Sequence, residues 1–219
     1  MQLWEFVLTG GPCAGKTTAI SVIEQVLSKK GFKVIIVAET ATELINSGIT
    51  PWELGQNVFQ DILTNRSLNK ERTTREAVQL LGKDAVIIYD RGLMDGRAYT
   101  ELADYIEILA RHLITITEAR DHYDAVFHMV TAADGAEEFY TLENNTARRE
   151  TPEEAREKDL KTRNAWLGHT HLRVIDNSTG FKEKIDRLLK EIFIVMGLPV
   201  PVEIERKFLI KKPDLEALM

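Results

Sequence analysis

A short stretch near the N-terminus carries the residues best suited to binding phosphate. Residues 10–18 read GGPCAGKTT, which fits the Walker A pattern G-x-x-x-x-G-K-S/T. In such a loop, successive backbone N–H groups and the positive end of the following helix face an anion. Lys16 would reach the β- and γ-phosphates of a nucleotide, and the Thr17 hydroxyl would take one ligand position on Mg²⁺. The pattern predicts a nucleoside triphosphate site made of Gly11, Pro12, Cys13, Ala14, Gly15, Lys16, Thr17 and Thr18.

An aspartate and an arginine close an apolar run further along the chain. Residues 85–90 read AVIIYD, the hhhhD pattern of a Walker B strand, so the Asp90 carboxylate would hold Mg²⁺ opposite Thr17. The next residue is Arg91, where AAA+ ATPases and many motor proteins have a glutamate that polarises water. A cation at this place suits a site that grips an anionic group or stabilises a transferring phosphoryl group.

The rest of the chain predicts the elements that must position these residues. Apolar runs predict strands over residues 3–8, 32–38, 85–90, 124–130 and 171–176. Helices are predicted over residues 18 to about 30, 50–82 with a bend near 64–67, 98–118, 151–165 and 179–197, with capping boxes at Thr50 and Thr151. Strands alternating with helices predict a three-layer α/β fold, an open parallel five-stranded sheet with helices on both faces. Ligands bind such sheets outside the carboxyl ends of the strands.

Composition narrows the class of protein. The chain has 219 residues, 44% of them hydrophobic and 28% charged, which suits one α/β domain of ordinary size. No apolar run approaches the roughly 20 residues of a membrane helix, and the N-terminus leads straight into a strand, so no signal peptide is predicted. The single cysteine, Cys13, excludes an internal disulfide and fits a cytoplasmic protein. The net charge of −6 disfavours a broad nucleic-acid-binding face.

The chain divides at about residue 198 into a nucleotide-binding domain, 1–198, and a tail, 199–219. In the tail, Glu203, Glu205 and Lys207 form an E-x-E-x-K pattern that resembles the first strand of CYTH, or triphosphate-tunnel, domains. Those domains need far more residues than the chain has left, so a working tunnel is not predicted. An isolated strand would have to pair with the sheet edge or with a second copy of the chain, which would make a homodimer.

Taken together, these motifs resemble a family of P-loop kinase-like proteins. Its members are AAA-type ATP-binding proteins related to NadR-type ribosylnicotinamide kinases and deoxynucleoside kinases, and they are often fused to a CYTH domain. The resemblance covers roughly residues 3 to 210 and rests on residues 9–18, 39–43, 90–92, 148–150 and 174–178.

The resemblance implies roles for residues outside the phosphate loop. Glu39 stands where deoxynucleoside kinases place their general base, and a carboxylate there can take a proton from an acceptor hydroxyl, although a carboxylate near a helix start also has a purely structural explanation. Arg148 and Arg149 would belong to a lid that closes over the phosphates, and Asn177 to the loop that contacts the base. The expected catalytic residues are Lys16, Glu39, Asp90, Arg91, Arg148 and Arg149.

Two further residues have competing explanations. Asp95 could orient a substrate or a water molecule, but Asp-Gly is also a common turn. Trp52 could stack on an acceptor ring, but an aromatic in the first turn of a helix is more often part of the core.

Two functions of different classes fit these residues. The first is a Mg²⁺- and ATP-dependent transfer of phosphate to a hydroxyl of a small nucleoside-like acceptor. The second is a nucleotide-dependent switch or binding module, using ATP or GTP, without transfer. The guanine motif of GTPases, N/T-K-x-D after a strand, is missing, which favours ATP. A sheet in which the phosphate-loop strand lies between the third and fourth strands would favour the kinase class.

Overall fold

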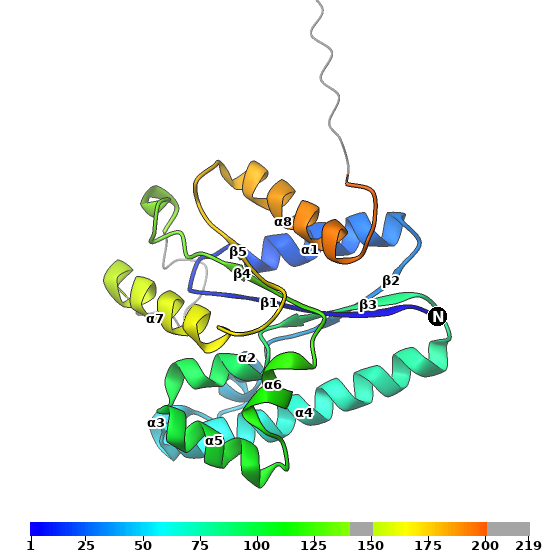
Figure 1. Cartoon of the computed structure of the whole chain (residues 1–219). Helices are drawn as coiled ribbons and strands as arrows, with labels where there is room; N and C mark the ends of the chain where they lie inside the picture. Colours follow the sequence, from blue (N-terminus) through cyan, green and yellow to red (C-terminus); the bar gives the residue numbers. More distant parts are fainter. Residues whose placement is uncertain (141–150, 201–219) are drawn as a thin grey trace, which may run out of the picture.

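The computed structural model describes residues 1–140 and 151–200. Its strands are β1 Leu3–Gly10, β2 Lys33–Val37, β3 Ala85–Asp90, β4 Ala125–Met129 and β5 Leu172–Ile175. Its α-helices are α1 Lys16–Lys29, α2 Thr40–Asn46, α3 Pro51–Leu54, α4 Gln56–Leu81, α5 Leu102–Arg111, α6 Ile116–Asp121, α7 Pro152–Ala165 and α8 Phe181–Val195, and two 3₁₀ helices are η1 Leu93–Tyr99 and η2 Glu137–Phe139. The predicted α/β architecture is confirmed (Figure 1).

All five strands are parallel and lie in the order β2-β3-β1-β4-β5. The strand that leads into the phosphate loop therefore lies between the third and fourth strands, the order expected of the kinase class. Leu8 of β1 pairs with Asp90 of β3, so the carboxyl ends of these two strands reach the same edge of the sheet. This register brings the Walker A and Walker B residues to adjacent strand ends.

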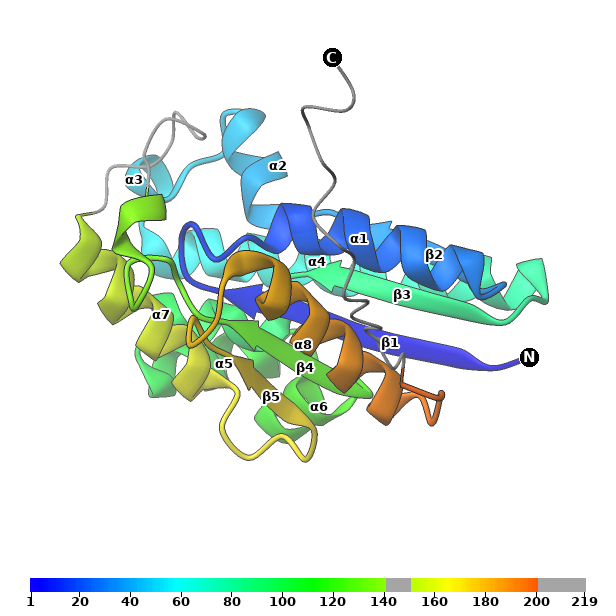
Figure 2. The ribbon, with the colours of Figure 1, turned by 90° about the horizontal axis from the view of Figure 1, so that it is seen from above.

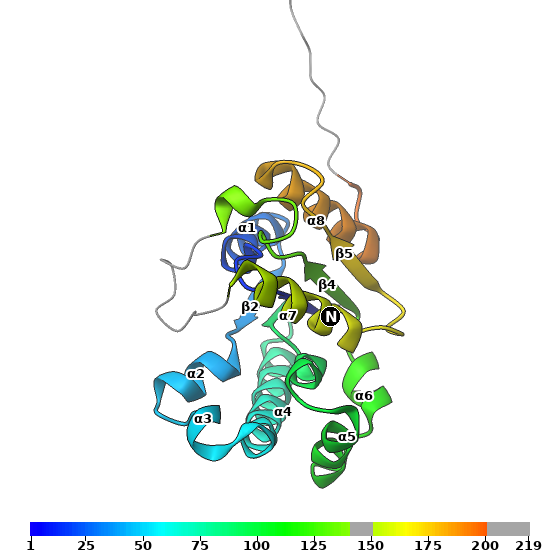
Figure 3. The same ribbon diagram turned by 90° about the vertical axis from the view of Figure 1, so that its left-hand side faces the viewer.

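Helices cover both faces of the sheet and enclose two cores. The side chains of β1 alternate between them: Phe6 and Leu8 pack with α1 and α8, whereas Val7 packs with residues of α4, η1 and α5. This double burial explains why the central strands are mostly apolar. Figure 2 shows α1 and α8 together over one face, and Figure 3 looks onto the carboxyl ends of the strands with α7 lying in front of them.

Several boundaries differ from the prediction for identifiable reasons. The helix expected over residues 50–82 breaks at Gly55, whose φ of 80° departs from helical geometry. Beyond it α4 runs through the expected bend at 64–67 without interruption, because burial of side chains such as Thr64 outweighs weak local propensity. The helix expected over 98–118 is divided into α5 and α6 near Leu113, which has a φ of 58°.

Capping and burial were predicted with mixed success. Thr151 forms the expected capping box with Glu154. Thr50 does not cap a backbone N–H; its hydroxyl donates to the Glu53 carboxylate instead, at 2.7 Å. The second strand was expected to be buried, but β2 lies at the sheet edge and Ile36 is 39% exposed.

Two predicted features fall outside the described residues. They are the lid arginines, Arg148 and Arg149, and the CYTH-like strand around Glu203 to Lys207. Within the described ranges, no helix combines the length and apolar character needed to cross a lipid bilayer.

Candidate functional site

The loop between β1 and α1 has the backbone of a phosphate cradle. Gly15 is the N-cap residue of α1 and has a φ of 87°. As a glycine, it has no side chain that could accept a hydrogen bond from the first N–H groups of the helix. This φ would strain any side chain at the position, and a Cβ would lie 2.5 Å from Cε2 of Phe181, so the Phe181 ring would have to move. The first N–H groups of α1 are therefore not capped by the Gly15 position and face outward from the end of a 14-residue helix. This geometry suits an anion.

The Lys16 side chain folds back over the loop. Its Nζ lies 3.4 Å from the Gly10 carbonyl oxygen and 3.5 Å from that of Gly11. Burial, reinforced by the nearby Arg91 cation, lowers the pKa of Lys16 to about 8, against the opposing effect of Asp90 and other carboxylates. Lys16 thus lies among several charged side chains. The negative charge of a bound phosphate would favour the protonated form of the lysine.

The Asp90 carboxylate is suited to a magnesium ion. Its Oδ1 atom is buried and has no hydrogen-bond partner among the described residues. Burial raises the pKa of Asp90, Lys16 opposes this rise, and the neighbouring Glu39 adds to it. No group of three or more acidic, histidine or cysteine side chains in the described ranges could hold a metal alone. A magnesium ion here would need ligands beyond the protein carboxylates, and its binding by Thr17 and Asp90 stays a prediction.

Arg91 is held between two carboxylates. Its Nε lies 3.0 Å from Oε1 of Glu39, and its Nη1 lies 3.3 Å from Oδ1 of Asp95. Burial opposes the charge, but Tyr99, Glu39 and Asp95 keep the pKa of Arg91 above its ordinary value. Its backbone has a φ of 71°, an unusual conformation for arginine of the kind found at functional sites. The structure thus brings Glu39 and Arg91, two of the residues expected to be catalytic, into contact.

Asp95 positions this cluster and is more than a turn residue. It is buried, accepts the backbone N–H of Gly92 at 2.8 Å, and accepts a hydrogen bond from the Thr9 hydroxyl on β1. Together with its contact to Arg91, these bonds fix the start of η1 against the central strand. Orientation of a substrate or a water molecule by Asp95 stays a prediction.

Glu39 is held in its ionised form. Burial raises the pKa of Glu39. The cations of Arg91 and Lys16 and a 2.7 Å hydrogen bond from the Thr42 hydroxyl lower it by more than burial raises it, so the pKa lies below the ordinary value. A carboxylate with this protonation can accept a proton at neutral pH.

A pocket of about 390 Å³ opens beside these charges. Lys16, Glu39, Asp90 and Arg91 form part of its wall, and the remainder comes from Pro12, Gly92, α2, α3, α4, η1 and Lys158 of α7. Trp52 lines it and is 72% exposed. The explanation of Trp52 as a core residue is therefore wrong.

Gln60 is a pocket residue that sequence reasoning missed. It is only 3% exposed, and its Oε1 atom has no partner in the part of the chain that the structure describes. Nothing in its sequence context separates it from other polar residues of a long helix. Burial of an unpaired amide oxygen costs free energy, which marks Gln60 as a residue able to bond a ligand.

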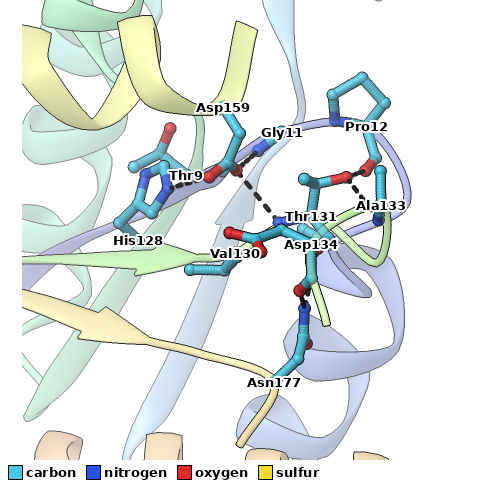
Figure 4. A network of polar contacts seen from close by, with 12 residues as sticks. Thr9, Gly11, Pro12, His128, Val130, Thr131, Ala133, Asp134, Asp159 and Asn177 are labelled. Atoms are coloured by element: carbon cyan, nitrogen blue, oxygen red, sulfur yellow. Dashed lines mark hydrogen bonds and ion pairs between the residues drawn. The ribbon is translucent and has the colours of Figure 1, made fainter. Parts of the chain in front are cut away.

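Asn177 braces the loop after β4. Its Nδ2 donates to the carbonyl oxygens of Thr131 and Asp134, at 2.7 and 2.6 Å (Figure 4). Its Oδ1 accepts from Lys184 at 2.7 Å. Its side chain is thus engaged with protein groups, and contact with a nucleotide base stays a prediction.

Lys184 ties α8 to the phosphate loop. Its Nζ donates to the carbonyl oxygens of Ala14, at 3.2 Å, and Val130, at 2.7 Å, and the residue is almost completely buried. Burial lowers the pKa of Lys184 to about 8, although Asp159 opposes the shift. No motif in the sequence pointed to this contact.

Replacing Lys184 by methionine is expected to change how stability depends on pH. The pKa of Lys184 in the folded protein, about 8, lies below the 10.5 of an ordinary lysine. Between these values the unfolded chain binds the additional proton, so the free energy of unfolding rises with pH. Lys184→Met should be less stable near neutral pH, because two carbonyl oxygens lose their donor, and should show a smaller rise, since only Lys184's share is lost and Lys16, whose pKa is also lowered to about 8, keeps its own. Urea unfolding at about pH 7.5 and pH 10 tests this.

The exposed Lys182 on the same helix supplies the control. Lys182→Met should retain the rise of the wild-type protein. An equal rise in wild type and Lys184→Met would contradict the assignment of the low pKa to Lys184.

The parallel sheet, the glycine-bent loop and the Lys16–Asp90 group define a P-loop nucleotide-binding protein. The family model described as AAA domain matches residues 5–184, and the chain belongs to this family. No curated protein matches the chain.

Proposed function

We propose that the protein transfers the γ-phosphoryl group of ATP to a hydroxyl of a small nucleoside-like acceptor. The observation that supports this proposal is the pocket of about 390 Å³ whose wall includes Lys16, Glu39 and Arg91. Hydrolysis requires space for one water molecule, whereas this volume is in the range of small-ligand sites. The phosphate loop would therefore be flanked by a general base, a cation and a space large enough for an organic acceptor.

The charges suggest how the groups would divide the work. Glu39, ionised at neutral pH, would take the proton of the acceptor hydroxyl while the oxygen of that hydroxyl forms a bond to the γ-phosphorus. The bond between that phosphorus and the β–γ bridging oxygen breaks, and ADP leaves with the electron pair. Lys16 and Arg91 would stabilise the charge on the transferring group. A magnesium ion held by Thr17 and Asp90 would neutralise charge on the phosphate oxygens.

The pocket side chains favour a flat, polar acceptor. Trp52, Phe59 and Tyr99 offer aromatic faces or edges, and Gln60 offers the unpartnered amide described above. Aromatic faces stack on planar heterocycles, and an amide can pair with the edge of such a ring. A nucleoside has both a ring of this kind and hydroxyl groups.

The direct test incubates the protein with Mg²⁺, labelled ATP and a panel of nucleosides, nucleotides and 5′-hydroxyl oligonucleotides. Transfer of label to a member of the panel, lost in Glu39→Gln, is the expected result. Binding and slow hydrolysis of ATP without transfer to any member would contradict the kinase proposal and favour the nucleotide-dependent switch.

Changing the pocket wall is expected to weaken acceptor binding selectively. Trp52→Ala and Gln60→Leu should each raise the KM for the acceptor by about tenfold, because each removes a contact of roughly 1 to 1.5 kcal/mol. The KM for ATP should change little, since neither residue belongs to the phosphate loop. Steady-state kinetics with the best acceptor of the panel measure both constants.

Leu54→Ala is a matched control, because Leu54 shares α3 with Trp52 and is exposed but does not line the pocket. Its two KM values should equal those of the wild type. Equal effects of Trp52→Ala on both substrates would place the acceptor elsewhere.

A further inference from the structure

Asp159 of α7 reaches into the phosphate loop from 148 positions away in the sequence. Its Oδ1 accepts the backbone N–H of Gly11 at 2.6 Å and that of Thr131 at 3.1 Å. Its Oδ2 lies 3.1 Å from Nε2 of His128, a fully buried residue of β4. Figure 4 shows the carboxylate between the loop and the strand end. One side chain thus joins three separate segments.

The contacts of Asp159 differ from the surface ion pairs of α7. The ion pair between Glu157 and Lys161 is exposed and lies along the helix surface, where such pairs contribute little. Asp159 is 5% exposed, and a buried charge is tolerated only where donors satisfy it. Burial raises its pKa, but the His128 contact and the two backbone N–H groups lower it below the ordinary value.

The close approach depends on glycine at position 11. A Cβ on Gly11 would lie 2.7 Å from Oδ1 of Asp159 and 2.8 Å from its Cβ. Gly11, the second glycine of the loop, is outside the defining positions of the Walker A pattern. Its packing against Asp159 explains why a glycine is needed there. The loop and α7 are therefore fitted to one another.

The same helix also touches the Arg91 side of the site. Lys158, the residue before Asp159, lines the pocket, and its Nζ lies 5.9 Å from the centre of the Tyr99 ring. Trp166, at the end of α7, packs so closely on Gly92 that a Cβ there would lie 2.9 Å from its ring. One helix thus contacts the nucleotide loop, the pocket and the turn that follows Arg91.

We propose that Asp159 is a positioning residue that couples the docking of α7 to nucleotide binding at the phosphate loop. The coupling rests on the proposed binding of ATP and runs through the backbone of Gly11. A loop held in its binding conformation by α7 binds phosphate more tightly. By thermodynamic reciprocity, bound nucleotide then stabilises α7 in its docked position by the same factor.

Hydrogen–deuterium exchange of the full chain, with and without MgATP, tests this reciprocity. In the wild type, ATP is expected to slow amide exchange both in the phosphate loop and in residues 152–165 of α7. Asp159→Ala should bind ATP about tenfold more weakly, the loss expected of a hydrogen-bonded charge. At saturating ATP its loop should still be protected, but ATP should no longer slow exchange in α7.

Glu157→Gln is the matched control on the same helix and should behave as the wild type in both measurements. Asp159→Asn keeps the size of the side chain and is used if Asp159→Ala does not fold; it should show the same losses in weaker form. Affinity within twofold of the wild type, or undiminished ATP protection of α7, in the folded variant overturns the proposal. Failure of the wild type to bind ATP would instead overturn the proposed function.

Discussion

Lys16→Ala is expected to reduce phosphotransfer by roughly a thousandfold or more and to abolish measurable ATP binding at micromolar concentrations. The lysine supplies the charge nearest the phosphates, and no other cation of the loop can replace it. Its contacts to the Gly10 and Gly11 carbonyl oxygens are long, at 3.4 and 3.5 Å. Little of the fold therefore depends on it.

Stability separates this explanation from simple unfolding. Because the surroundings lower the pKa of Lys16 to about 8, they disfavour its charge, and its removal should leave the free energy of unfolding unchanged or slightly higher. ATP titration and urea unfolding of the same preparation measure both quantities. Lys29→Ala, at the other end of α1, is the control and should bind ATP normally. Unchanged affinity in Lys16→Ala would refute the phosphate-loop assignment.

Glu39→Gln is expected to lower kcat for phosphotransfer by about a hundred- to ten-thousandfold, the usual contribution of a general base. The amide oxygen can still accept from Arg91, and the amide NH2 can donate to the Thr42 hydroxyl, which can turn to accept, so the geometry of the site should persist. ATP affinity should remain within a few-fold of the wild type. Single-turnover transfer and ATP titration distinguish the two effects.

The pH profile gives an independent reading of the same residue. The pKa of Glu39 lies below its ordinary value, and a base is active when deprotonated. The wild-type rate should therefore increase with pH only in the acid range, below the ordinary range of a glutamate, and be level above it as far as this group is concerned.

Glu43→Gln is the control, since Glu43 lies on α2, which begins directly after Glu39, and pairs with Lys70 at 2.8 Å, outside the pocket lining. Its kcat and pH profile should be those of the wild type. A Glu39→Gln protein that keeps its kcat but loses ATP affinity would contradict the role as a base.

Local physical chemistry made part of this fold predictable. The strand Ala85–Asp90 was predicted with its observed bounds, because an apolar run ending on a carboxylate has few alternatives in an α/β chain. The capping box at Thr151 was predicted for a similar reason, since both partners lie within four residues.

The residues that escaped prediction depend on contacts distant in sequence. Asp159 reads as one more charge on a polar helix, and only the packing of α7 brings it to Gly11. Gln60 reads as a surface residue of α4, but the fold buries it. The break at Gly55 was missed because weak helix formers at 64–67 were the more conspicuous signal, and tertiary burial overrode them.

The pairing of Leu8 with Asp90 means that the proposed metal site depends on the register between β1 and β3. Successive side chains of a strand point to opposite faces, so a slip of β3 by one residue against β1 would turn Asp90 away from the loop and present Tyr89 in its place. The placement of Asp90 thus depends partly on apolar side chains that never contact the nucleotide. A core substitution that shifts this alignment should abolish the proposed phosphotransfer while the chain still folds.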